Sequence, residues 1–227
     1  MLDTRTPSVA RAYDYLVGGE ASFAADQALA GRLAALYPGL AANLLASRTQ
    51  VADAVAHIAR QGVDQYLDVG AGLPTMPSVH STARALLAPA RVVYIDRDPV
   101  VTTHGAALVP PGVRYQDGDL TEPEALLAAL AFIDVSRPVC LVLALVLQAI
   151  EPGTARAVVG VLVKALPPGS YLVATLGAGD AGRLPDSVWA AGATEADLAA
   201  FFGGLELLPP GITRRGEVLC ATGVKRG

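Results

Sequence analysis

The sequence predicts an α/β fold in which a mostly parallel sheet carries helices on both faces and a helical cap precedes it. From residue 65 onward, short apolar runs alternate with helical patterns, which is typical of parallel strands joined by crossover helices. Before that point only helical patterns occur. With 227 residues, 52% of them hydrophobic, the chain can form one domain with an ample core. We therefore expect a cap over residues 1–62 and a core over residues 63–227, joined as one structural unit.

The cap is expected to contain three helices and the core five strands with four helices between them. The cap helices are expected at residues 8–18, 23–37 and 40–61. The strands are expected at residues 66–69, 91–96, 113–119, 138–145 and 170–176, and the intervening helices at residues 78–87, 99–109, 122–133 and 152–166. A Gly-rich loop at 177–193, a helix at 194–202 and strands near 205–210 and 217–224 complete the chain.

Composition and charge exclude several classes of protein. The formal net charge is -4 and the basic residues are scattered, so we expect no nucleic-acid partner. The N-terminus lacks the apolar core of a signal peptide, and no apolar run approaches the ~18 residues of a membrane span. Cys140 and Cys220 lie in apolar runs and are expected to be reduced core thiols. We expect a cytoplasmic protein without a membrane partner or a metal site.

The turn after the first predicted strand, in YLDVGAGLPT, indicates the kind of ligand. Ligands of parallel sheets bind beyond the carboxyl ends of the strands, where glycines such as Gly70 and Gly72 let the backbone approach them closely. A dinucleotide site would have a third glycine near Thr75 and a helix that begins at once. Pro74 and Pro77 delay the helix instead. The predicted ligand therefore has no pyrophosphate.

Acids at three strand ends specify this ligand further. Asp68 could face an ammonium group, and Asp96 lies 24 residues after Gly72, close to the ~20 expected of a ribose-binding acid. Asp119 could accept a hydrogen bond from an adenine amino group while Leu120 packs on the ring. Taken singly, a glycine turn can be merely a turn and an Asp merely a helix cap. Together they favour S-adenosylmethionine, which joins adenosine to a charged amino acid without phosphate.

Several segments resemble the actinobacterial S-adenosylmethionine-dependent methyltransferase family that was formerly a domain of unknown function. They are SVARAYDYLVGG, FAAD, YLDVGAGLPT, VVYIDRDPVV, DVSRPV, GSYLV and FFGGLELLPPGI, and the likeness covers nearly the whole chain. The resemblance implies a Rossmann-like class I methyltransferase fold, with a seven-stranded sheet whose last strand is antiparallel and a helical cap over the pocket. It also implies cofactor contacts at Asp68, Gly70, Gly72, Asp96 and Asp119. Together with Arg97 and Leu120, these are the cofactor-binding residues that we expect.

The chain departs from the family pattern where a substrate or the reacting end of the cofactor would be held. Gln148 stands where the family usually has a histidine, and Thr175 and Leu176 stand in place of a Ser-His pair. Glu20 replaces a common lysine, and the loop after Gly177 is shorter than the family leads us to expect.

Candidate catalytic residues are few, because methyl transfer depends mainly on orientation and needs a base only for a protonated nucleophile. His80 follows the glycine turn on the ligand side and is the predicted base. Tyr15 and Arg48 of the cap complete the predicted catalytic set, with Arg48 as a site for an anionic substrate group and a solvated face as its alternative. His57 and His104 are expected to be surface or packing residues.

Two more aromatic residues of the cap, Tyr13 and Phe23, could close over the pocket. Ordinary helix packing is the alternative for both residues, and it is the favoured one for Phe23.

The predicted function is methyl transfer to a small molecule of secondary metabolism, and two alternatives stay open. The same fold could perform an elimination or ring closure in natural-product biosynthesis, such as aziridine formation by loss of sulfate. Arg48 and Arg97 would then face the leaving group while a carboxylate or His80 takes the proton. The chain could also be a non-catalytic subunit that stabilises a partner. A homodimer or a complex with another protein is compatible with each function.

Overall fold

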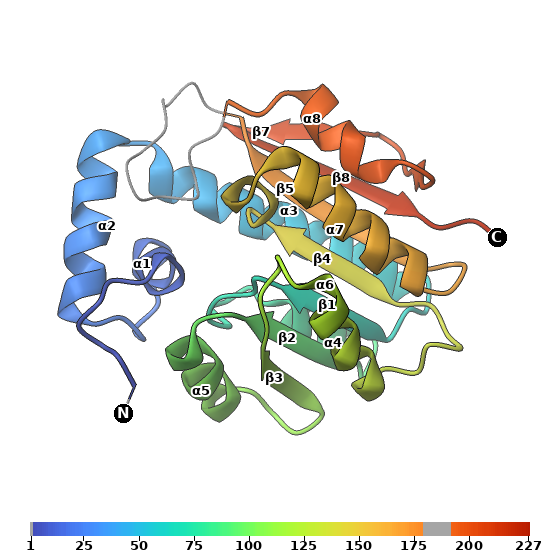
Figure 1. Ribbon diagram of the computed structural model, residues 1–227, viewed down its shortest axis with the longest axis horizontal. Helices are drawn as coiled ribbons and strands as arrows, with labels where there is room; N and C mark the ends of the chain where they lie inside the picture. Colours follow the sequence, from blue (N-terminus) through green and yellow to red (C-terminus); the bar gives the residue numbers. More distant parts are fainter. Residues whose placement is uncertain (1, 179–191) are drawn as a thin grey trace.

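A mixed sheet forms the centre of the computed structural model, which describes residues 2–178 and 192–227 (Figure 1). Within these residues the sheet has eight strands in the order β3-β2-β1-β4-β5-β8-β6, and β7 pairs with β8 beside this path. The strands are β1 (Gln65–Val69), β2 (Arg91–Asp96), β3 (Val113–Asp117), β4 (Cys140–Ala144), β5 (Tyr171–Gly177), β6 (Glu206–Leu207), β7 (Thr213–Arg215) and β8 (Val218–Val224).

The strand directions confirm the Rossmann-like fold that the sequence predicts. Strands β1 to β5 pair in parallel, and β8 runs antiparallel to β5 and β6. The sheet has one strand more than the seven expected. This strand, β7, has three residues and forms a hairpin with β8. Its sequence Thr-Arg-Arg has no apolar alternation, so the pattern could not reveal it.

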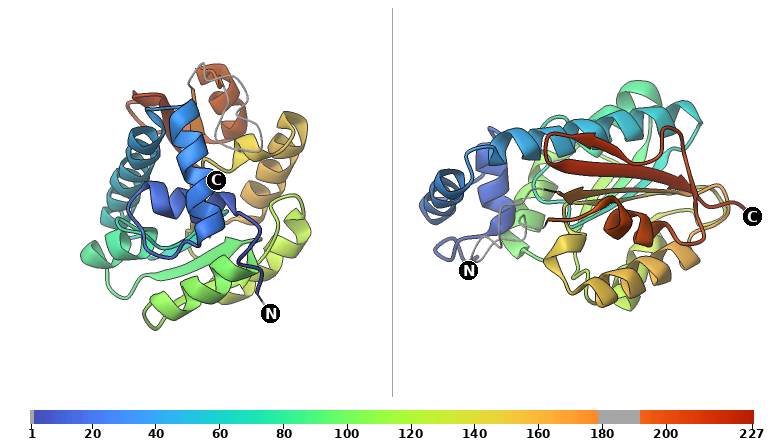
Figure 2. Two further views of the ribbon diagram at one scale, coloured as in Figure 1. Left: turned by 90° about the vertical axis from the view of Figure 1, so that its left-hand side faces the viewer. Right: turned by 90° about the horizontal axis from the view of Figure 1, so that it is seen from above.

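Helices cover both faces of the sheet (Figure 2). On one face lie α3 (Leu40–Arg60) and α4 (Val79–Leu86), and on the other lie α6 (Pro123–Leu127), α7 (Pro152–Ala165) and α8 (Glu195–Ala199). Helix α5 (Pro99–Leu108) packs along β2 and β3. Side chains alternate along each strand, so Leu67 and Val69 of β1 face the α6 and α7 side while Tyr66 faces the α3 side. Short 3-10 turns follow α6, β4 and α8, at Ala128–Phe132, Leu147–Ala149 and Ala200–Phe202.

Helix α3 joins the cap to the core. Its first part packs with α1 (Val9–Leu16) and α2 (Ala24–Leu36) through Leu40 and Leu44. Its second part packs against the sheet through Val51, Val55 and Ile58. The cap's apolar cluster also contains Leu145 and Val218 of the core, so packing is continuous across the predicted boundary at residue 62. Helices α1 and α2 lie beyond the end of the sheet to which the parallel strands point (Figure 1).

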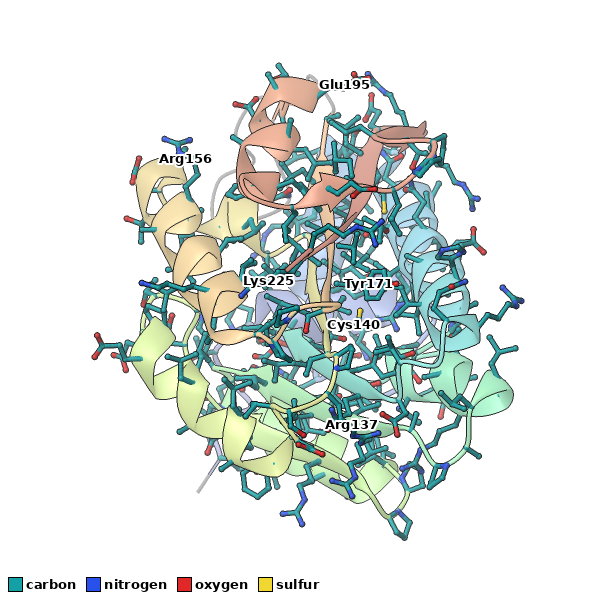
Figure 3. All side chains as sticks on the ribbon, turned by 90° about the vertical axis from the view of Figure 1, so that its right-hand side faces the viewer. Arg137, Cys140, Arg156, Tyr171, Glu195 and Lys225 are labelled. Atoms are coloured by element: carbon teal, nitrogen blue, oxygen red, sulfur yellow. The ribbon has the colours of Figure 1, made fainter. Side chains whose placement is uncertain are left out.

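Lys225 follows β8 at the opposite end of the sheet, beside the end of α7 (Figure 3). The Lys225 ammonium donates to the carbonyl oxygens of Val163, Lys164 and Leu166 at the end of α7. The helix dipole favours a cation at this end of a helix. Cys140 and Cys220 are free and buried, as predicted.

Among residues 2–178 and 192–227, no single helix has the length and apolarity to cross a membrane. Helices α2 and α3 reach that threshold only as a pair bent by 102°.

The predicted delay of the helix after the glycine turn is confirmed. Helix α4 begins at Val79, and the Ser78 hydroxyl caps it by accepting a hydrogen bond from the Ser81 amide at 3.3 Å. Nine residues of irregular backbone, 70–78, thus separate β1 from α4 and are free to contact a ligand. Most of the Gly-rich loop expected at 177–193 lies outside the described residues.

Candidate functional site

A cavity of about 550 Å³ lies between the carboxyl ends of the central strands and the cap. Loops that follow β1, β2, β3 and β4 line it from the sheet side, and residues 3–13 and part of α3 line it from the cap side. All seven residues predicted to bind the cofactor line this cavity, and so does Arg48. They are Asp68, Gly70, Gly72, Asp96, Arg97, Asp119 and Leu120.

The glycine turn depends on two residues with positive φ. Gly70 has a φ of 68°, and a Cβ there would approach the Val146 side chain to 2.3 Å, so only glycine fits. Gly72 has a φ of 60°, but a Cβ there would meet no atom closer than 3.9 Å. The Gly70 amide donates to the Ile95 carbonyl at 2.8 Å, which fastens the turn to the end of β2. The turn therefore brings bare backbone against the cavity.

Asp96 ends β2 and is almost fully buried, with 6% exposure. Its Oδ2 accepts the Gly72 amide at 2.8 Å and its Oδ1 accepts the Asp98 amide at 3.0 Å. Burial raises the pKa of Asp96, and these two amides oppose the rise. Each carboxylate oxygen keeps further acceptor capacity, so the group can still receive two hydroxyl donors from a ligand.

Asp119 and Leu120 follow β3. The Asp119 Oδ1 accepts the Thr121 amide at 2.8 Å, and this hydrogen bond is the main reason why the pKa of Asp119 is lowered. The Arg97 guanidinium lies 3.9 Å from Asp119 Oδ2. Leu120 is buried at the cavity wall. Asp117, the last residue of β3, bonds to Thr102 instead and does not line the cavity.

Asp68 and Arg48 are two further charged residues that line the cavity. Asp68 is 8% exposed, and its carboxylate has no hydrogen-bond partner among the described residues. Burial raises the pKa of Asp68 to about 7, the nearby Arg48 guanidinium opposes the rise and the Asp96 charge adds to it. Arg48 donates to the carbonyl oxygens of Thr75 and Pro77 and lies over the Tyr13 ring, 5.3 Å from its centroid. The position of Arg48 in the cavity wall is thus compatible with its predicted role as a residue that binds an anionic group.

The structure does not support His80 as a base. The His80 ring does not line the cavity; its Nδ1 lies 2.9 Å from the Tyr94 hydroxyl and 3.1 Å from the Ser78 hydroxyl. The His80 amide donates to the same Tyr94 oxygen at 2.9 Å. Burial lowers the pKa of His80. His80 therefore supports the start of α4 from behind the cavity wall, because the second residue of the helix turns its side chain toward β2.

Tyr15, the third residue predicted to be catalytic, also lies outside the cavity. Its side chain is 45% exposed and does not line the cavity, because α1 turns Tyr13 toward the cavity instead. Phe23 packs against the Arg11 guanidinium and the His104 ring, in line with the packing alternative. His57 is exposed on α3.

The departures from the family pattern have structural roles. The Gln148 side chain accepts the Gly177 amide at 2.7 Å. The Thr175 hydroxyl is fully buried, lies 2.8 Å from the Ser47 hydroxyl and accepts the Leu145 amide at 3.1 Å. Leu145 has a φ of 54°, the left-handed conformation that non-glycine residues rarely adopt, and it lines the cavity. Thr175 and Gln148 therefore hold the loops at the ends of β4 and β5.

Some residues of the site were missed by sequence reasoning. Tyr94 lines the cavity and stacks on Tyr115 with ring centroids 4.8 Å apart, and the Tyr115 hydroxyl donates to the Gly72 carbonyl at 2.9 Å. Arg11 and Asp98 also line the cavity and pair at 3.1 Å. The arginine in the SVARAYDYL segment was the available signal, but its partner Asp98 lies 87 residues away.

Comparisons with known proteins concern the family and the fold of the chain. A family model described as S-adenosyl methyltransferase matches residues 1–218. A solved structure from Thermobifida fusca YX, described as a candidate methyltransferase, is 32% identical with a TM-score of 0.88 and covers 99% of this chain and 97% of its own. A DUF574 family protein from Streptomyces avermitilis MA-4680 is 31% identical with a TM-score of 0.88, over 99% of this chain and 100% of its own.

A more distant likeness concerns the fold alone. Magnesium protoporphyrin IX methyltransferase from Synechocystis PCC 6803, solved with S-adenosylhomocysteine, is 14% identical with a TM-score of 0.58 over 94% of this chain and 93% of its own. No curated protein matches the chain.

Proposed function

The chain belongs to the S-adenosyl methyltransferase family, and from this premise we propose that it methylates a small molecule held between the sheet edge and the cap. Membership of the family makes it an S-adenosylmethionine-dependent methyltransferase. The observation that carries the proposal is the cavity of about 550 Å³, where the glycine turn, three strand-end acids and the cap meet. This volume lies in the range of ~300–1,000 Å³ that small-ligand sites occupy.

The residues of the cavity fit this cofactor. Asp68 lines the cavity and no described residue donates to its carboxylate, so it is suited to a ligand that brings a donor, such as the ammonium group of an amino acid. Asp96 would accept from the ribose hydroxyls, and Asp119 from the adenine amino group with Leu120 against the ring. When bound, the cofactor supplies a methyl group on a positively charged sulfur. Gly70 and Gly72 would let the backbone lie close to it.

The acceptor is proposed to occupy the part of the cavity lined by residues after β4. Leu145, Val146, Ala149 and Ile150 make this wall apolar, and Arg48 adds a cation whose Nε is buried without a partner in the described part of the chain. An apolar molecule that carries an anionic group fits these residues. A secondary metabolite of this kind is the acceptor class that we propose.

The proposed reaction depends on orientation. No histidine is among the described residues that line the cavity. Acceptors whose nucleophile is already unprotonated at neutral pH, such as a carboxylate or an aromatic amine, would need no protein base. Holding the reacting groups in line can contribute ~7–11 kcal/mol to lowering the barrier.

Elimination or ring closure is the second candidate, because Asp68 and Arg48 lie in the same cavity. With a pKa of about 7, Asp68 could take a proton from an attacking amine, and Arg48 could face a departing anion. Such a reaction would consume no S-adenosylmethionine. Formation of S-adenosylhomocysteine in step with product therefore separates the two candidates.

The proposal is tested with S-adenosylmethionine that carries a radiolabelled methyl group. The protein is incubated with this donor and, in parallel, with a small-molecule extract, a protein fraction and a nucleic-acid fraction. We expect label in the small-molecule fraction alone and an equal amount of S-adenosylhomocysteine. Label confined to either macromolecular fraction would contradict a small acceptor.

A further inference from the structure

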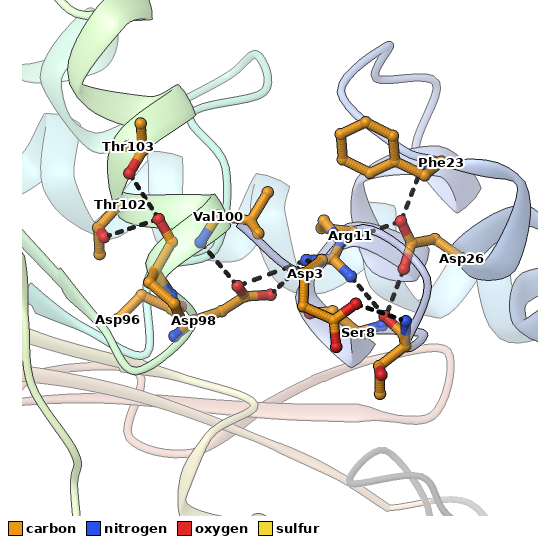
Figure 4. A network of polar contacts seen from close by, with 12 residues as sticks. Asp3, Ser8, Arg11, Phe23, Asp26, Asp96, Asp98, Val100, Thr102 and Thr103 are labelled. Carbon is orange, nitrogen blue, oxygen red and sulfur yellow. Dashed lines mark hydrogen bonds and ion pairs between the residues drawn. The ribbon is translucent and has the colours of Figure 1, made fainter. Parts of the chain in front are cut away.

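Arg11 of α1 lies at the centre of a buried polar network that joins the cap to the cavity wall (Figure 4). Its side chain is only 2% exposed. The Nε donates to Asp26 Oδ2 at 2.9 Å, and Nη1 donates to Asp98 Oδ2 at 3.1 Å. One guanidinium thus pairs with a carboxylate of α2 and with the carboxylate that caps α5.

The same guanidinium holds the segment before α1. Nη2 donates to the Thr6 carbonyl at 2.7 Å, and Nη1 approaches the Asp3 carbonyl at 3.5 Å. Asp26, the carboxylate that Arg11 pairs with, also accepts the Ser8 amide at 2.8 Å. This segment, residues 3–8, forms the N-terminal wall of the cavity through Asp3, Thr6, Pro7 and Ser8. Within the segment, the Asp3 carboxylate accepts the amides of Arg5 and Thr6. The hydrogen bonds that tie its backbone to side chains outside the segment go to Arg11 and Asp26.

The network also reaches the acid expected to bind ribose. The Asp98 side chain accepts the Val100 amide at 2.9 Å and the Arg11 guanidinium, while the Asp98 amide donates to Asp96 Oδ1 at 3.0 Å. A shift of Asp98 would move the donor that orients the Asp96 carboxylate. Arg11 is thus one residue removed from the Asp96 side chain.

The geometry requires an arginine. The planar guanidinium presents donors in several fixed directions, and here they are used on two carboxylates and two carbonyl groups. A lysine keeps the charge but has one nitrogen and cannot reach these partners together. Asp26 is fully buried, so its carboxylate needs a paired cation, which Arg11 supplies.

We propose that Arg11 is a positioning residue for cofactor binding, which holds the N-terminal wall against the nucleoside end of the cavity and orients Asp96 through Asp98. The inference rests on the proposed function, because Asp96 defines the nucleoside end. Arg11 acts through these neighbours and is not itself a catalytic residue.

The test compares full-length variants by the rate at which S-adenosylhomocysteine dissociates, measured by stopped-flow displacement. Arg11→Lys keeps the charge, and Asp98→Asn keeps the cap of α5 because an Asn side chain can also accept the Val100 amide. Arg32→Lys on the exposed face of α2 is the matched control. Hydrogen exchange of residues 3–10 is followed with and without S-adenosylhomocysteine.

We expect Arg11→Lys and Asp98→Asn to speed dissociation at least tenfold, and the double variant to add little, because both act on one network. Exchange of residues 3–10 should rise in Arg11→Lys, and ligand should slow this exchange in the wild type. Dissociation within twofold of Arg32→Lys, with only the Tm lowered, would overturn the proposal and leave Arg11 a structural residue. If Arg11→Lys does not fold, Asp98→Asn decides alone. A wild type that does not bind S-adenosylhomocysteine would overturn the proposed function instead.

Discussion

The pH dependence of cofactor binding follows from the position of Asp68. Burial raises the pKa of this carboxyl to about 7, so a large part of it is protonated in the free protein at pH 6 and below. The bound ammonium group would favour the ionised form and lower the pKa again. Binding therefore requires the proton to leave, and we expect affinity for S-adenosylhomocysteine to fall as the pH decreases below 7.

The size of the effect comes from the fraction of Asp68 that is ionised. For a pKa of about 7, ~10% of the free protein is ionised at pH 6 and ~1% at pH 5. The Kd should therefore rise about tenfold between pH 7.5 and pH 6, and about a further tenfold at pH 5. Asp119 does not contribute to this slope, because the Thr121 amide keeps its pKa low. Burial also raises the pKa of Asp96, and the Asp68→Asn variant separates the contribution of Asp68 from that of Asp96.

Calorimetric titration between pH 5 and pH 8 measures this slope. Repeating the titration in buffers with different ionisation enthalpies should show that about one proton is released on binding near pH 6. Asp68→Asn should bind more weakly at pH 8 and lose most of the slope. A Kd that is constant from pH 8 to pH 5, or an Asp68→Asn variant that keeps the wild-type slope, would refute the assignment of Asp68 to the ammonium group.

Three further predictions concern individual residues. Asp68→Asn should raise the Tm of the ligand-free protein at pH 8, by about 2–4 °C per kcal/mol gained, because folding raises this pKa and the free protein loses stability as the pH rises from about 4 to 7. In scanning calorimetry this gain should become smaller as the pH falls and should be absent below about pH 4. Gly70→Ala should lower the Tm more than Gly72→Ala, since only Gly70 has Val146 in the way, and equal losses would contradict the packing at the turn. His80→Gln should leave S-adenosylhomocysteine affinity within about threefold in a calorimetric titration, because its ring lies off the cavity, whereas a hundredfold loss would restore it to the site.

The parallel part of the fold could be predicted because four of its strands, β1, β2, β4 and β5, are mostly buried and appear as apolar runs. The helices between them follow from their spacing, and the delayed start of α4 from Pro74 and Pro77. Strand β7 escaped because a three-residue polar hairpin strand has no pattern. The double role of α3 escaped as well, since apolar periodicity shows which face is buried but not against which partner.

The strand-end acids were predictable for a topological reason. Parallel strands present their carboxyl ends at one edge, so Asp68, Asp96 and Asp119 had to lie near one another. Contacts between the cap and the core, such as the pair of Arg11 with Asp98, depend on how two distant segments dock and leave no spacing signal. The sequence placed His80 correctly just after the glycine turn, but it could not show which way the side chain points. The His80 ring faces Tyr94 and not the cavity.

The central claim is that Asp96 at the end of β2 holds the ribose of the cofactor, and the affinity of Asp96→Asn for S-adenosylhomocysteine tests it most directly. Hydrogen bonds to a charged group contribute ~1.5–3 kcal/mol each, so loss of the charge should weaken binding by about 100-fold at pH 8. The matched control is Asp117→Asn, which changes an acid at the next strand end that does not line the cavity, and its Kd should stay within about twofold of the wild type. Equal Kd values for Asp96→Asn and Asp117→Asn would contradict the account.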